Sequence, residues 1–248
     1  MRAEQKTMKS WITPGSARTL AGFCAAALLA LGGATHIVGT SIMLLLLTTG
    51  MIPGWAKLLR LPNSNTAKWI MSLTALAAVL AAGLGTLTHT AIVMAGAIVA
   101  CFIAEMFRTD GRYKLVEQIS GDFTGAILVI CASMWIHLVK LDGSSNVMVV
   151  AAIALAVGAV ISAFDSPRAH ILTFLNTTAF ATAVAFIMGS PILVGVIIGV
   201  FVGLAYYLTR RAVRSLPQRE DPAISVSRTL IPYCALGLIS YLVGILLV

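Results

Sequence analysis

The sequence predicts an all-α fold, a polytopic transmembrane helical bundle of eight or nine membrane segments. Of the 248 residues, 59% are apolar and only 10% are charged, and the mean hydropathy is +0.96. An ordinary soluble domain has about 45–50% apolar and about 25% charged residues. One crossing needs about 20 apolar residues. The chain therefore has room for eight or nine crossings and none for a soluble catalytic domain.

The first apolar stretch, residues 20–51, follows a polar segment, residues 1–19, that we expect in the cytoplasm. A helix over this stretch would be about 48 Å long, too long for one upright crossing and short for two. We expect a broken hairpin of two short helices that turns back at Gly32-Gly33. Residues 20–248 then form a single transmembrane bundle.

The positions of lysine and arginine favour the hairpin. If residues 20–51 turn back, 16 of the 17 cations lie on one side and only Lys140 lies on the other, whereas a single crossing gives 12 and 5. Cytoplasmic loops carry the excess of Lys and Arg. We therefore expect nine segments in the cytoplasmic cell membrane, with the N-terminus cytoplasmic and the C-terminus external.

Apolar windows of about 18–20 residues, bounded by polar residues, glycine or proline, mark seven further crossings. They are residues 68–86, 89–107, 123–140, 146–164, 170–188, 191–208 and 229–248. Trp11, Trp55, Trp69 and the pair Tyr206-Tyr207 fall at predicted span ends, where an aromatic belt would place them.

A stripe of glycines lies in the window 191–208. Gly195, Gly199 and Gly203 are four residues apart, so they share one helix face and permit close approach of a neighbouring helix. We expect this face to serve intramolecular packing, with an interface to a partner as the alternative.

Ionisable residues inside or beside the bilayer are candidates for a polar cluster, because burying an unpaired charge there costs at least about 2.5–3.5 kcal/mol. Glu105 can meet Arg108 on one helix face. Asp122 opens one predicted span and suits a helix N-terminus, and Asp165 closes another, just before Arg168. Helix capping and local ion pairing explain these acids, and a shared polar pocket is the alternative.

Asn176 belongs to the most polar predicted span, 170–188, where interhelical hydrogen bonds are expected and a solute path is the alternative. Near the cytoplasmic surface, residues 112–120 have the pattern of a short amphipathic helix lying flat at the interface. Cations predicted to face anionic lipid headgroups on this side are Arg112, Lys114, Arg210, Arg211 and Arg214.

The order of parts resembles the CDP-diacylglycerol synthases (phosphatidate cytidylyltransferases). The resemblance rests on the Gly-Gly hairpin, the polar mouth at residues 119–125, a span ending in Asp165, and a glycine-rich span leading to Arg210-Arg211. It implies a similar layout over about 200 residues. The chain lacks that family's metal-binding and nucleotide-binding motifs, and nucleotidyl transfer needs carboxylates that hold a divalent cation. The segment 54–62 also resembles multi-spanning membrane proteins of actinobacteria, which implies no activity.

Neither metal nor cofactor is predicted, and no catalytic residue stands out. The four cysteines are scattered singly and no two histidines have metal-ligand spacing. A net charge of +8 in so apolar a chain indicates contact with lipid headgroups, not nucleic acid.

The expected function is therefore that of a non-catalytic integral membrane protein, an accessory or lipid-binding subunit of a larger respiratory or cell-envelope complex. Expected partners are membrane lipids with anionic headgroups and other membrane-protein subunits. The alternatives are a permease for a lipid-linked or small apolar solute, based on Asn176 and Glu105, and a divergent lipid-headgroup nucleotidyltransferase, which needs Asp122 and Asp165 at one metal site.

Overall fold

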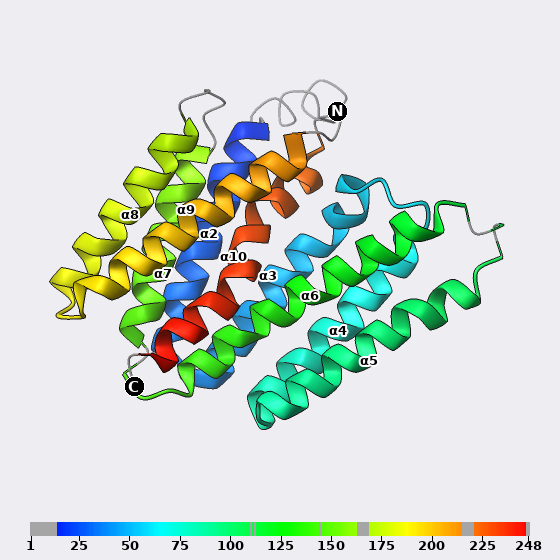
Figure 1. Cartoon of the computed structure of the whole chain (residues 1–248), viewed down its shortest axis with the longest axis horizontal. Coiled ribbons are helices and arrows are strands. Elements are labelled where there is room, and N and C mark those ends of the chain that lie inside the picture. Colours follow the sequence, from blue (N-terminus) through cyan, green and yellow to red (C-terminus); the bar gives the residue numbers. More distant parts are fainter. Residues whose placement is uncertain are drawn as a thin grey trace, which may run out of the picture.

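The computed structural model describes residues 14–109, 111, 113–143, 145–162, 169–214 and 221–246, and over these residues the regular structure is entirely helical (Figure 1). The described residues form nine helices, which are α2 (Pro14–Ala34), α3 (His36–Leu58), α4 (Ser64–Leu84), α5 (Leu87–Met106), α6 (Leu115–Val139), α7 (Ser145–Ser162), α8 (Ala169–Ile187), α9 (Ile192–Arg214) and α10 (Pro222–Ile245). Six are long and apolar enough to cross a membrane, and the other three contain somewhat shorter apolar stretches. The predicted all-α class is confirmed, and the composition of these helices indicates a membrane protein.

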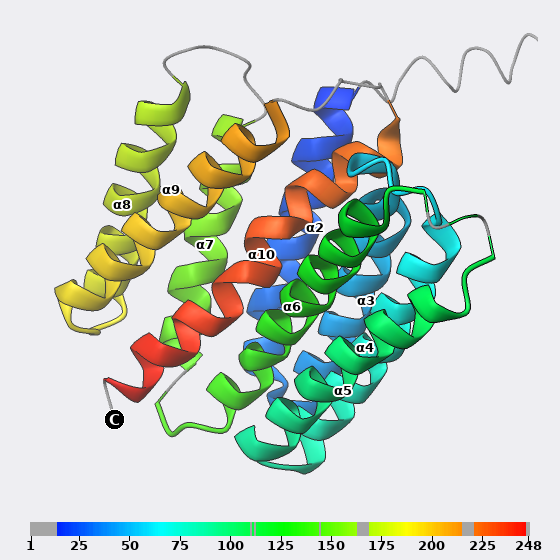
Figure 2. The same cartoon turned by 45° about the vertical axis from the view of Figure 1, so that its right-hand side comes forward.

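The first two helices form a hairpin in which α2 and α3 run in opposite directions (Figures 1 and 2). The chain reverses at Thr35, and His36 follows with a left-handed backbone (φ 61°). Gly32 lies in the last turn of α2, where its carbonyl oxygen accepts a hydrogen bond from Thr40 Oγ1 at 2.9 Å. The expectation of two short helices is wrong. α2 begins before residue 20, and α3 continues through Pro53 to Leu58, although Pro53-Gly54 ends the apolar window in the sequence.

The start of α6 also corrects a prediction. Residues 115–120 are not a separate helix lying flat at the interface; they are the first turns of one helix that runs to Val139. α6 packs closely against the α3–α4 loop at Gly121, where a Cβ would collide with the side chain of Leu61. Asp122 consequently lies two turns inside α6 and does not cap it.

Successive helices alternate in direction (Figures 1 and 2). This alternation brings the starts of α2, α4, α6, α8 and α10 to one end of the bundle, which we call the cationic end. Of the lysines and arginines that the structure describes, only Lys140 belongs to the opposite end. The others are Arg18, Lys57, Arg60, Lys68, Arg108, Lys114, Arg210, Arg211, Arg214 and Arg228.

At the centre of the bundle, α10 packs against α2, α3, α6, α7 and α9, while α5 touches mainly α4 and α6 at one edge and α8 touches mainly α7 and α9 at the other. Buried aromatic side chains bond to backbone carbonyls of other helices. Trp135 Nε1 donates to Tyr233 O (3.0 Å), the Tyr233 hydroxyl to Gly22 O (2.7 Å), and the Tyr206 hydroxyl to Leu155 O (3.0 Å). Such bonds satisfy polar atoms that lipid cannot.

Two of the predicted belt aromatics are therefore core residues. Trp55 is 4% exposed and Tyr206 is 6% exposed, whereas Trp69 is 69% exposed. The belt interpretation is wrong for Trp55 and Tyr206 because a residue near the end of a helix can still face the inside of the bundle.

The glycine stripe of α9 faces α8. A Cβ built on Gly195, Gly199 or Gly203 would lie within 3 Å of backbone atoms of α8, at Ala181-Thr182, Thr177-Thr178 and Phe174 respectively. The close approach also allows Thr177 Oγ1 to donate to Gly199 O across the interface at 3.1 Å. The lack of a side chain at these three positions of α9 thus sets the distance between α8 and α9.

Candidate functional site

A buried charge cluster lies at the cationic end between α5 and α6. Glu105, in the last turn of α5, and Arg108 form an ion pair at 2.9 Å between Oε2 and Nη1, and both side chains are 3% exposed. Arg108 Nη2 also donates to the carbonyl of Tyr113 at 2.7 Å. Asp122 of α6 is fully buried and lies within the electrostatic reach of both Glu105 and Arg108.

Gln118 ties this cluster to the α3–α4 loop. Its Nε2 donates to Oδ1 and Oδ2 of Asp122, at 3.0 and 3.1 Å, and to the carbonyl of Asn63 at 3.2 Å. Its Oε1 accepts from the backbone N–H of Asn63 at 2.9 Å. Gln118 and Asp122 are one helical turn apart, so both side chains lie on the same face of α6. Sequence analysis missed Gln118 and Asn63, because a lone amide and a loop backbone give no pattern.

The structure brings together three of the six predicted cluster residues, Glu105, Arg108 and Asp122. Asp165 and Arg168 lie outside the described residues. Asn176 lies elsewhere, on α8 at the far edge of the bundle, where its Nδ2 donates to the carbonyl of Leu172 in its own helix at 2.8 Å. Asn176 therefore lies apart from Glu105, Arg108 and Asp122, because α8 packs with α7 and α9. The shared pocket of the three acids stays a prediction, since Asp165 is not described.

A partly open groove of about 550 Å³ lies on the other side of the α6 N-terminal half. Its walls come from α3 and the following loop, α6, α9 and α10, and they are mainly apolar. The lining residues are Trp55, Leu58, Leu59, Leu61, Glu117, Ser120, Gly121, Thr124, Leu128, Leu208, Thr209, Ala212 and Ile231. Trp55 links α3 to α6 in the groove wall, since its Nε1 donates to the carbonyl of Gly121 at 3.1 Å.

Two exposed arginines are next in the chain to residues that line this groove. Arg60, which is exposed and has a left-handed backbone, lies between the lining residues Leu59 and Leu61. Arg211 precedes the lining residue Ala212 on α9, is exposed, and donates weakly to the Tyr207 hydroxyl at 3.4 Å. The groove thus has a mainly apolar lining, and Arg60 and Arg211 belong to the chain segments that form two of its walls.

The predicted headgroup cations fall into two groups. Arg210, Arg211 and Arg214 form the last turns of α9 beside the groove. Lys114 directly precedes α6, is exposed, and places its ammonium 5.6 Å from the ring centroid of Tyr113; Arg112 lies outside the described residues. Arg60 was not among the candidates, because a single loop cation is indistinguishable in sequence from one that only sets topology.

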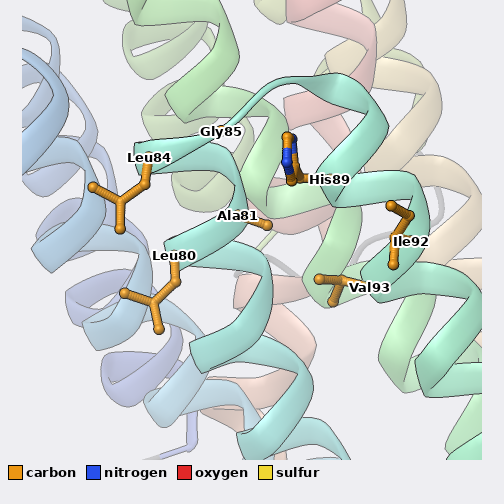
Figure 3. A pocket seen from close by; sticks show the side chains of 7 residues that line it. All are labelled: Leu80, Ala81, Leu84, Gly85, His89, Ile92 and Val93. Atoms are coloured by element: carbon orange, nitrogen blue, oxygen red, sulfur yellow. The ribbon is translucent and has the colours of Figure 1, made fainter.

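The opposite end holds a smaller apolar pocket between α4 and α5, with a volume of about 370 Å³. Figure 3 shows His89 beside the turn that joins the two helices, with Ile92 and Val93 further along α5. His89 Nδ1 accepts a hydrogen bond from the backbone N–H of Thr86 at 3.2 Å, so the ring helps to begin α5. Because the His89 ring is occupied by this hydrogen bond and the rest of the lining is apolar, the pocket has no evident chemical function.

Among the residues that the structure describes, no three His, Cys, Asp or Glu side chains are placed to hold a metal ion. The nucleotidyltransferase alternative stays a prediction, since its second carboxylate, Asp165, lies outside those residues.

Comparison of the chain with protein family models, with curated proteins and with solved structures found no match.

Proposed function

We propose that this chain is a non-catalytic, lipid-binding component of the cytoplasmic membrane, and that its groove holds an anionic phospholipid. The observation that supports this proposal is the groove beside the end of α9, which is apolar inside and whose lining residues are next in the chain to the exposed Arg60 and Arg211. One acyl chain would occupy the groove, and the headgroup phosphate would lie near the guanidinium groups.

The cations should decide which lipid binds. An acyl chain gains little on leaving the bilayer for the groove, because lipid tails are already an apolar solvent for it. A cation near the surface contributes about 1 kcal/mol of attraction to anionic lipid. We therefore expect selectivity for an anionic headgroup. Selectivity for the shape of the acyl chain should be a smaller effect.

The same charges suggest the orientation. Of the described charged residues, ten cations and four carboxylates belong to the cationic end, whereas only Lys140 and Asp142 belong to the other. By the positive-inside rule the cationic end, and with it the N-terminus, would face the cytoplasm. The groove would then open at the inner leaflet.

An accessory role in a larger complex fits the position of α5. Within this helix only Thr90, Ala97, Cys101 and Glu105 are buried, so a single stripe faces the bundle. Its outer face is apolar and would be covered by lipid or by a helix of another subunit. Other membrane proteins would then be partners of this chain.

Replacing Arg60 and Arg211 together by glutamine should weaken binding of phosphatidylglycerol about 30-fold. Each lost cation removes about 1 kcal/mol, roughly a factor of five, while binding of phosphatidylcholine should not change. Native mass spectrometry of the detergent-solubilised protein with each lipid measures both affinities. Lys140→Gln at the opposite end is the matched control. Equal affinity of the double variant and the control for phosphatidylglycerol would refute the proposal.

A further inference from the structure

Counted over the residues that the structure describes, the charge cluster between α5 and α6 has one more buried negative charge than positive charge. It contains the carboxylates of Glu105 and Asp122 and the guanidinium of Arg108, and all three are nearly or fully buried. The charged groups whose fields act on Asp122 are Glu105 and Arg108. Charges in such a place are normally paired, because burial removes the water that would otherwise stabilise them.

The hydrogen-bond donors in the cluster do not bring the second positive charge that would balance the two carboxylates. Arg108 is engaged with Oε2 of Glu105, while Oε1 of Glu105 is buried and has no hydrogen-bond partner. Asp122 accepts hydrogen bonds from the amide of Gln118, which is a neutral donor held in place by the backbone of Asn63. One unsatisfied carboxylate oxygen thus coincides with one unbalanced negative charge.

In the described part of the chain, few groups around the cluster could supply this charge. Cys101, one turn before Glu105 on α5, is buried within the field of Asp122 and carries no positive charge. On α4 the cation is Lys68, which is only partly buried, and on α6 Glu117 is exposed and adds to the negative charge. On α3, Lys57 is engaged with Asp221 at 2.8 Å.

We propose that Glu105 and Asp122 together bind one small monovalent cation, a proton or Na⁺. The bound charge would neutralise the cluster, and Oε1 of Glu105 would obtain its missing partner. A divalent ion fits less well, because it would leave an excess of positive charge. This site is separate from the lipid groove, on the opposite side of α6, and it would give the protein a response to the ion composition of one compartment.

Thermal unfolding of the purified protein in detergent tests the proposal. Sodium chloride is titrated against choline chloride at constant ionic strength and constant pH, and pH is then varied without sodium. A cation that binds only the folded state raises Tm, by about 3–6 °C at a concentration tenfold above Kd for a chain of this size. A rise with sodium identifies Na⁺, and a rise on acidification without any sodium effect identifies a proton.

Glu105→Gln and Asp122→Asn should each remove this rise, because either change leaves the cluster neutral without a bound cation. Asp142→Asn, an exposed carboxylate at the opposite end, should retain the wild-type response. Binding of radioactive sodium to the wild-type protein provides a readout that needs no variant. The proposal is overturned if Tm of the wild type follows sodium and pH in the same way as Tm of Glu105→Gln, which preserves the size of the side chain and an acceptor for Arg108.

Discussion

Replacing Arg108 by leucine is expected to lower the free energy of unfolding by about 3–5 kcal/mol, the cost of removing one partner from a buried ion pair. The change leaves Glu105 and Asp122 as two buried carboxylates with no fixed cation between them. It also removes the hydrogen bond from Nη2 to the carbonyl of Tyr113, which helps to hold the end of α5 near the start of α6. Unfolding of the detergent-solubilised variant by increasing SDS measures the loss.

A double variant provides the control for this prediction. Replacing both Glu105 and Arg108 by leucine removes the pair together and leaves no new unpaired charge, so most of the stability should return. Similar destabilisation of the single and double variants would show that Arg108 acts through packing and not through its charge.

Gly199→Leu should destabilise the protein by about 3 kcal/mol, at the upper end of overpacking effects. A Cβ at Gly199 would meet the backbone of α8 at Thr177 and Thr178, and backbone atoms cannot move aside as a flexible side chain can. The helices would have to separate, and the hydrogen bond from Thr177 to Gly199 O would be lost. SDS unfolding and the yield of folded protein report the effect.

Gly96→Leu on α5 is the matched substitution, because a Cβ at Gly96 would meet no atom within 4 Å. We expect a change of no more than about 0.5 kcal/mol, typical of surface sites. Equal losses at the two positions would mean that Gly199 matters for a reason other than its closeness to α8.

The sequence was sufficient to predict the helical class and the apolar composition of most of the helices, because long apolar windows depend only on local composition. Local composition was a poor guide to where helices end. α3 passes through Pro53, and α10 begins at Pro222, well before its apolar window at residue 229, because the side chain of Asp221 accepts a hydrogen bond from the N–H of Ala223. Tertiary packing and capping extend these helices beyond what hydropathy indicates.

The candidate sites were predictable only where neighbours in space are neighbours in sequence. Glu105 and Arg108 lie three residues apart, a spacing that places both on one helix face. The position of Gln118 against Asn63, 55 residues away, depends on how α4 packs beside α6. The apolar groove likewise joins residues from Trp55 to Ile231, and no periodicity in one chain segment reveals a surface formed by four helices.

Cysteine labelling in intact cells tests most directly whether the cationic end faces the cytoplasm, on which the position of the proposed lipid groove depends. Lys114→Cys and Asp142→Cys, both at exposed positions, are placed singly in a variant without the four native cysteines and treated with a membrane-impermeant maleimide. We expect labelling at position 142 in intact cells, and at position 114 only after the membrane is opened. Labelling at position 114 but not at position 142 in intact cells would contradict this orientation.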